Sequence, residues 1–126
     1  MIYRTIEFKK YKINSNAASI INIHILIYYD DQFKTWVAYC LELNLVTESK
    51  RQKNVIKYTI DLIRAHVNYA LENNNWCFLW SFAPKPYWDK YNYEQTNKNN
   101  KIYKGNLILK KHTNFSIEIL IKTKKK

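Results

Sequence analysis

The sequence has very few of the residues that usually form tight turns. Only one Gly, Gly105, and two Pro, Pro84 and Pro86, occur among 126 residues. Turns must therefore use Asn and Asp, which tolerate left-handed backbone geometry better than other residues that carry a Cβ. The same shortage excludes a phosphate-binding Gly-rich loop and a Gly-x-Ser-x-Gly nucleophile motif.

Cysteine is also scarce, and long apolar runs are missing. Cys40 and Cys77 match neither a CxxC motif nor the spacing of metal ligands, so we expect two reduced, buried thiols. No segment reaches the roughly 18 apolar residues of a membrane-spanning helix, and residues 1–7 lack the apolar core of a signal peptide. We therefore expect a cytoplasmic protein that uses no metal, no cofactor and no membrane.

Acidic residues are few compared with basic ones. The chain carries 21 Lys and Arg against 10 Asp and Glu, a formal net charge of +11. Residues 1–49 are neutral, residues 50–75 carry +3 and residues 76–126 carry +8. This asymmetry indicates a polyanionic partner, either nucleic acid or an acidic protein. A solvated basic surface without a dedicated partner is the alternative.

Apolar residues, in contrast, are plentiful enough for a core. They make up 47% of the chain, which fits a single domain over residues 1–126. Residues 20–29 are β-branched and uncharged, which predicts a central strand ending in a turn at Asp30 and Asp31. Its odd-numbered residues should face the core. His24 falls on the other face, and we interpret it as a residue of that less buried face rather than a catalyst.

The next segments predict two short strands and a long helix. The strands cover residues 35–40 and 44–47, and the helix covers residues 51–73. Apolar residues recur along the helix at steps of three and four, which predicts one face packed on a sheet. These residues are Ile56, Ile60, Ile63, Val67 and Ala70. The basic residues at the start of the helix lie largely off that face.

The two ends of the chain are less regular. Residues 1–12 predict a short strand and residues 76–80 a further strand or a cover for the core. The Pro-containing segment 83–88 is expected to be extended and segment 91–100 to be a polar loop. Residues 102–110 and 115–121 predict a β-hairpin, and residues 122–126 a disordered basic tail. The predicted fold is α+β: an antiparallel sheet of three or more strands packed against one long helix, with an added C-terminal β-hairpin.

Catalytic patterns are missing. Metal-dependent nuclease chemistry needs several carboxylates around bound metal ions. The candidates, which no spacing brings together, are Asp30, Asp31, Glu42, Glu48 and Asp61. We therefore expect that the protein is not an enzyme.

The middle of the chain resembles the HicB-like antitoxin family. The resemblance rests on Trp-Val-Ala-Tyr-Cys-Leu-Glu-Leu-Asn-Leu-Val-Thr at residues 36–47, preceded by an apolar strand and followed by a helix. It covers about residues 20–73, and residues 76–121 would be an extension. The family usually has Pro where Leu41 stands and Gly where Ser49 stands. The resemblance implies a truncated RNase H-like domain without nuclease chemistry, which in family members binds and masks a small RNA-cleaving toxin and commonly dimerises.

Three functions follow from these observations. The first is a non-enzymatic HicB-like interaction protein, either an antitoxin of a toxin–antitoxin pair or a related protein-binding regulator. It would bind through an exposed sheet edge or through the basic residues Lys50, Arg51, Lys53 and Lys57. The second is an RNA- or DNA-binding protein, with the candidate residues Lys101, Lys104, Lys110, Lys111, Tyr87 and Trp88. The third is a mobile-element inhibitor of a nucleic-acid-handling complex.

Overall fold

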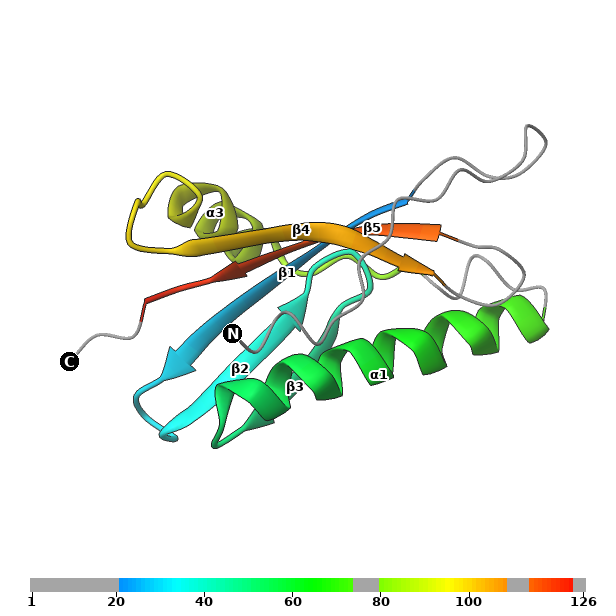
Figure 1. Cartoon of the computed structure of the whole chain (residues 1–126), viewed down its shortest axis with the longest axis horizontal. Coiled ribbons are helices and arrows are strands. Elements are labelled where there is room, and N and C mark those ends of the chain that lie inside the picture. Colours follow the sequence, from blue (N-terminus) through cyan, green and yellow to red (C-terminus); the bar gives the residue numbers. More distant parts are fainter. Residues whose placement is uncertain (1–20, 74–79, 109–113, 124–126) are drawn as a thin grey trace.

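The described part of the chain forms one mixed sheet with a helix on each face (Figure 1). This computed structural model describes residues 21–73, 80–108 and 114–123. The sheet has five strands in the order β3-β2-β1-β5-β4. The strands are β1 (Ile21–Asp30), β2 (Thr35–Cys40), β3 (Leu45–Ser49), β4 (Lys101–Ile108) and β5 (Asn114–Ile121). The helices of the described part are α1 (Gln52–Glu72) and α3 (Lys85–Glu94). The predicted α+β class, with a sheet packed against a helix, is confirmed.

β1 lies at the centre of the sheet. It pairs antiparallel with β2, and β2 pairs antiparallel with β3. On its other side β1 pairs with β5 in parallel, so the sheet is mixed and the predicted antiparallel pairing does not extend through it. Parallel neighbours need a long crossover, and here α1, α3 and β4 all lie between β1 and β5 in the sequence. The predicted C-terminal strand pair is present, since β4 pairs antiparallel with β5.

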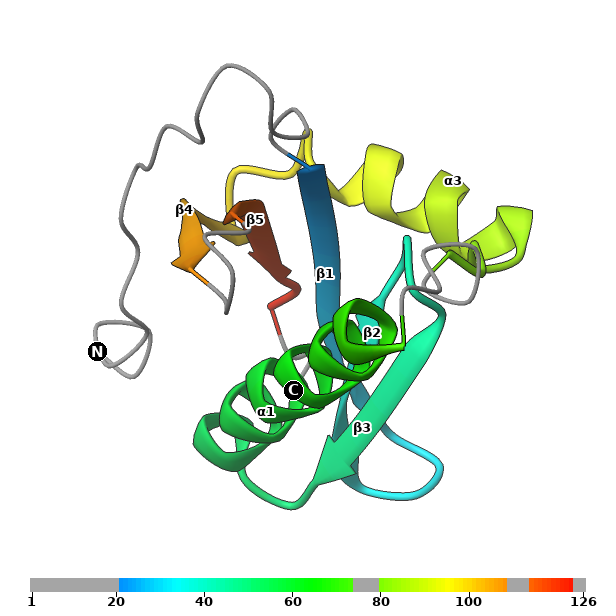
Figure 2. The ribbon, with the colours of Figure 1, turned by 90° about the vertical axis from the view of Figure 1, so that its right-hand side faces the viewer.

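The alternation of β1 separates two apolar clusters. Ile23, Ile25 and Ile27 are fully or almost fully buried on the face covered by α1. The other face was expected to be mixed and less buried. Leu26 on that face is nevertheless buried, because α3 packs over it and completes a second cluster with Tyr39 and Tyr91. Figure 2 shows α1 and α3 on either side of β1.

α1 packs on the sheet through the apolar face that its three- and four-residue periodicity predicted. Its expected core residues are all buried: Ile56, Ile60, Ile63, Val67 and Ala70. A polar contact joins the helix to β3 as well, between the hydroxyls of Thr47 and Thr59 at 2.6 Å. The buried Thr59 hydroxyl also donates to the Val55 carbonyl at 2.8 Å, so its hydrogen-bonding capacity is used inside the protein.

α3 corrects the prediction for the segment around the prolines. Residues 83–88 were expected to be extended and residues 91–100 to form a loop. Instead Lys85–Glu94 is helical, with Pro84 as N-cap and Pro86 inside the first turn. Proline is compatible with a first helical turn, because the N–H groups there have no partner within the helix. Residues 95–100 form turns and a bend, so the predicted loop is present only in that part.

The ends of the described segments also differ from expectation. The backbone N–H of Lys122 donates to the Ile27 carbonyl at 2.8 Å, and that of Thr123 donates to Asn100 Oδ1 at 2.8 Å. The first two residues of the predicted basic tail are therefore anchored. The predicted strand at 1–12, residues 76–79 and residues 124–126 lie outside the described residues. Neither helix of the described part is long and apolar enough to cross a membrane.

Candidate functional site

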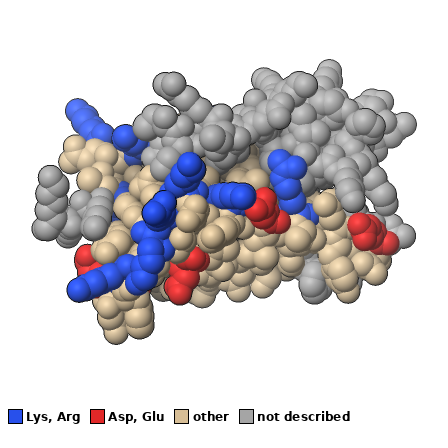
Figure 3. Space-filling view, turned by 60° about the horizontal axis from the view of Figure 1, so that its bottom comes forward, with Lys and Arg blue, Asp and Glu red and all other residues tan. Residues whose placement is uncertain are grey.

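The cations predicted to bind a partner gather where β3 passes into α1. Lys50, Arg51, Lys53 and Lys57 are all exposed there. Figure 3 shows Lys and Arg atoms concentrated over one end of the face that carries α1, with acidic atoms scattered among them. The structure therefore brings the predicted partner-binding residues together on one surface.

The turn between β1 and β2 belongs to the same surface. The Lys50 ammonium donates to the carbonyls of Phe33 and Lys34, both at 3.2 Å. Asp30 Oδ1 accepts the N–H of Gln32 at 2.9 Å, which fixes the turn from the other side. Lys34 has a positive φ of 51° and is exposed. We call this surface, made of Lys34, Lys50, Arg51, Lys53 and Lys57, the basic corner.

Most of the charge in the basic corner is uncompensated. Arg51, Lys53 and Lys57 form no ion pair with any residue that the structure describes. The first turn of α1 contains no acidic residue, although the positive end of the helix dipole favours one there. Cations at a helix N-terminus destabilise the helix by a few tenths of a kcal/mol each. The cations at the start of α1 therefore lower the stability of the helix and create a positive surface.

β3 is the sheet edge next to the basic corner. It is the last strand of the sheet, and none of the described residues pairs with its outer side. Val46 is 49% exposed, and the strand contains no Lys and no Pro. We predicted an exposed sheet edge as a binding surface. At β3, no described residue occupies that edge.

Of the six residues predicted for nucleic-acid binding, the structure describes Tyr87, Trp88, Lys101 and Lys104. Tyr87 and Trp88 are half-buried: Tyr87 packs on Tyr39 with ring centroids 4.4 Å apart, and the Trp88 indole donates to the Ala83 carbonyl at 3.1 Å. Lys101 and Lys104 are exposed on β4, and Lys104 lies 3.6 Å from Glu118. Lys110 and Lys111 lie outside the described residues. The two aromatic side chains therefore serve the packing of α3.

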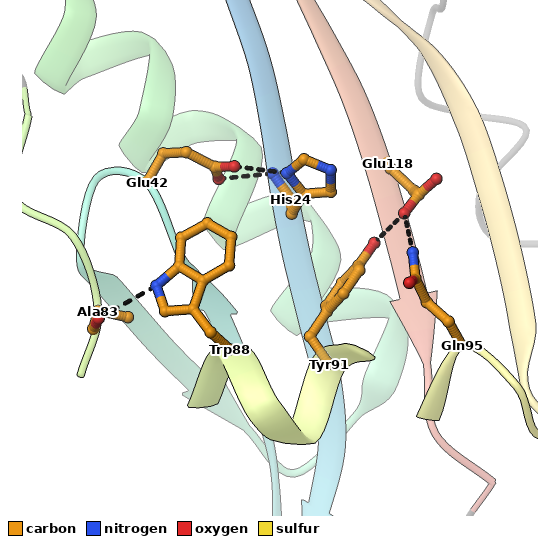
Figure 4. Close-up of polar contacts among 7 residues, drawn as sticks. All are labelled: His24, Glu42, Ala83, Trp88, Tyr91, Gln95 and Glu118. Atoms are coloured by element: carbon orange, nitrogen blue, oxygen red, sulfur yellow. Dashed lines mark hydrogen bonds and ion pairs between the residues drawn. The ribbon is translucent and has the colours of Figure 1, made fainter. Parts of the chain in front are cut away.

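A polar network that the sequence did not predict lies under α3. His24 Nδ1 contacts the Glu42 carboxylate, and the His24 backbone N–H donates to the same carboxylate at 2.7 Å (Figure 4). The Glu42 side chain is only 8% exposed, whereas that of His24 is 32% exposed. The hydrogen bond to Glu42 raises the pKa of His24 above its usual value, against the lowering effect of burial.

A second carboxylate continues the network on the other side of His24. Tyr91 donates to Glu118 at 2.5 Å and Gln95 donates to it at 2.9 Å. Burial raises the pKa of Glu118, but these hydrogen bonds together with the charges of His24 and Lys104 outweigh burial, so the pKa is lowered. The ring of His24 meets that of Tyr91 edge-on, with centroids 5.4 Å apart. The network thus fastens α3 to β1 and β5.

A small open hollow adjoins this network. It has a volume of about 180 Å³ and is lined by side chains of β1, β4 and β5, including His24, Lys104 and Glu118. A histidine beside a carboxylate is able to move a proton. In the part of the chain that the structure covers, however, no three metal-binding side chains come together. Each cation of the hollow already faces a carboxylate, so its charge is balanced.

The carboxylates considered for nuclease chemistry differ in their positions and contacts. Asp30 stabilises a turn, and Glu42 is buried against His24. Asp61 is exposed on α1, and Glu48 is exposed on β3. Cys40 is buried, as predicted, and burial raises the pKa of its thiol; Cys77 lies outside the described residues.

The hydrogen bond from Tyr91 allows a direct test of the network. The change Tyr91→Phe should lower the free energy of unfolding by about 1–1.5 kcal/mol, because Glu118 loses a donor in a partly buried place. Chemical denaturation measures this effect. Tyr93→Phe, on the exposed side of the same helix, is the matched control and should change stability by less than about 0.5 kcal/mol.

Comparison with known protein families, with curated proteins and with solved structures finds no match for this chain.

Proposed function

We propose that this protein is a non-enzymatic HicB-like interaction protein, an antitoxin of a toxin–antitoxin pair or a related protein-binding regulator. The observation that carries the proposal is the basic corner, whose cations form no ion pair with a described residue and lie next to a sheet edge that no described residue pairs with. The helix dipole favours acidic residues at the start of α1. Basic residues at that place are explained by an acidic partner that binds there.

The positions of the motif residues support this proposal. Residues 36–47 span β2, the following turn and β3, with α1 directly after them. Ala38 and Cys40 of this motif are buried in the core against α1. The turn after β2 places its positive φ, 54°, at Asn44, a residue type that tolerates it. Ser49, which stands where the family has Gly, has no positive φ.

The charge of the chain indicates which surface of a partner it would bind. A protein of net charge +11 associates faster and more tightly with an acidic surface than with a basic one. The partner would therefore present acidic residues to the basic corner, even if the partner acts on RNA elsewhere on its surface.

Growth rescue tests the proposal. A small protein encoded beside this one is expressed alone and together with this protein, and growth is recorded. We expect growth arrest by the small protein and recovery on co-expression. Recovery should disappear with Lys53→Glu/Lys57→Glu and persist with Lys98→Glu/Lys101→Glu, which makes the same charge change elsewhere. A lack of rescue by the unchanged protein counts against the antitoxin proposal.

Nucleic-acid binding is the competing function, and the charge of residues 76–126 favours it. Lys98, in the turn before β4, and Lys101, the first residue of β4, are exposed and form no ion pair with described residues. If they contact phosphates, binding of a labelled single strand should weaken by about tenfold or more between 50 and 200 mM salt. It should also weaken with Lys98→Glu/Lys101→Glu. Binding that is insensitive to both changes would exclude this function.

A further inference from the structure

We propose that the partner adds an acidic, extended segment to the sheet as a sixth strand beside β3. This inference rests on the proposed function and names the binding mode and the chemistry of the partner. The sheet has two outer strands, β3 and β4, so the first question is which of them accepts a strand.

The side chains of β3 leave its edge open, whereas those of β4 protect it. Sheet edges are usually protected by lysines or prolines, because either prevents pairing with another chain. β4 carries two exposed lysines, Lys101 and Lys104. β3 carries none, and its exposed Val46 offers an apolar contact to a neighbouring strand. β3 is therefore the edge at which a strand would add.

The charges around β3 determine the chemistry of that strand. Ser49 ends β3, Lys50 and Arg51 follow it directly, and Lys53 stands two residues further on. Acidic residues of the added segment would therefore lie beyond Ser49, next to the basic corner. Glu48 is exposed on β3 and repels a carboxylate placed directly beside it. The segment should thus be uncharged or apolar next to Val46 and acidic only at the end that passes Ser49.

A second copy of this chain fits the edge less well. Each copy carries a net charge of +11, so two copies repel each other. A second β3 would also bring no acidic cluster to the basic corner, since Glu48 is its one charged residue. An acidic segment of a different protein would pair with the backbone of the β3 edge and with the cations of the basic corner that have no ion pair to a described residue.

The test uses a labelled ten-residue peptide of alternating Val and Thr that ends in three Glu residues. We expect it to bind the full-length protein and to slow amide hydrogen exchange in residues 45–49, but not in residues 101–105. A peptide with Lys in place of Glu should not bind. A peptide with the same side chains but alternate N-methylated amides should lose the protection, because it cannot complete the edge hydrogen bonds.

Two variants with the same charge change separate the two edges. Val46→Asp should weaken peptide binding by about tenfold, since it places a carboxylate beside the added strand. Ile102→Asp, on β4, should weaken it by less than about twofold. Both side chains are partly exposed, at 49% and 40%, so both variants should fold.

Three results would overturn strand addition. The first is peptide binding without protection of residues 45–49, and the second is protection of residues 101–105 instead. The third is no binding of the peptide at any concentration. A β3–β3 dimer of this chain, detected by its mass, would replace the acidic segment as the occupant. The proposed function has its own test in growth rescue, which can succeed even if the partner binds the basic corner without adding a strand.

Discussion

Replacing Lys53 and Lys57 together by Glu should weaken binding of the protein partner by about 100-fold. Close charge pairs across an interface each couple by about 1.5 kcal/mol or more, and each factor of ten in affinity is 1.4 kcal/mol. Neither lysine forms an ion pair with a described residue, so the change removes no internal contact of that kind. Isothermal titration calorimetry with the purified partner measures the effect.

The same variant should fold at least as well as the unchanged protein. Lys53 lies in the first turn of α1, where a carboxylate interacts favourably with the helix dipole and a cation does not. We therefore expect the free energy of unfolding to stay equal or to rise by about 0.5 kcal/mol. Lys98→Glu/Lys101→Glu is the control for net charge and should retain partner binding. A loss of affinity that is equal in both variants would mean that only overall charge matters.

Replacing His24 by Ala should lower the free energy of unfolding by about 2–3 kcal/mol. Removal of one partner leaves the Glu42 carboxylate buried without its counter-charge, which costs about 3–5 kcal/mol at a fully buried site. We expect less because His24 is one-third exposed and water can replace part of its contact. The double variant His24→Ala/Glu42→Gln should recover part of the loss, because it removes the buried charge as well.

The pair should also make stability depend on pH. The pKa of His24 is higher in the folded protein than the usual value of 6.5, so the folded state holds the proton more tightly. This contribution is fully present below pH 6.5 and is lost as pH rises through the folded pKa. Urea denaturation between pH 5.5 and 8.5 should show falling stability in the unchanged protein. The double variant should show a flatter profile, and equal profiles would contradict a stabilising ion pair.

The sequence predicted the central elements because their signals are local. Alternating isoleucines define β1, and a step of three and four residues defines α1. α3 was missed because its helical state depends on contacts from far away in the chain. Its proline pair and polar composition predict an extended segment or a loop. Packing of Tyr91 against β1 and β5 favours the helix instead.

The His24–Glu42 pair could not be predicted for a related reason. The two residues are 18 positions apart, and neither belongs to a recognisable motif of ion pairs. They meet because β1 and β2 pair with Ile25 opposite Cys40. The Leu41 N–H then donates to the His24 carbonyl at 2.9 Å, which brings Glu42 next to His24. Strand register, which the sequence alone did not define, creates the pair.

The basic corner was predicted only in part. Its four cations at the start of α1 are consecutive or nearly so, and the helical period placed them off the core face. Lys34 was missed because it belongs to the turn between β1 and β2, which reaches the corner through the contact of Lys50 with Phe33 and Lys34. The available signal was a lysine at the end of a predicted turn, which is too common to identify a site.

One pull-down tests the central claim most directly. The tagged protein, Lys53→Glu/Lys57→Glu and Lys98→Glu/Lys101→Glu are each recovered from the host with and without nuclease treatment. We predict that the unchanged protein and the second variant retain the same protein partner, and that the first variant loses it. Equal recovery of that partner with all three proteins would contradict a partner site at the basic corner. Recovery of nucleic acid alone, lost on nuclease treatment, would contradict protein binding as the function.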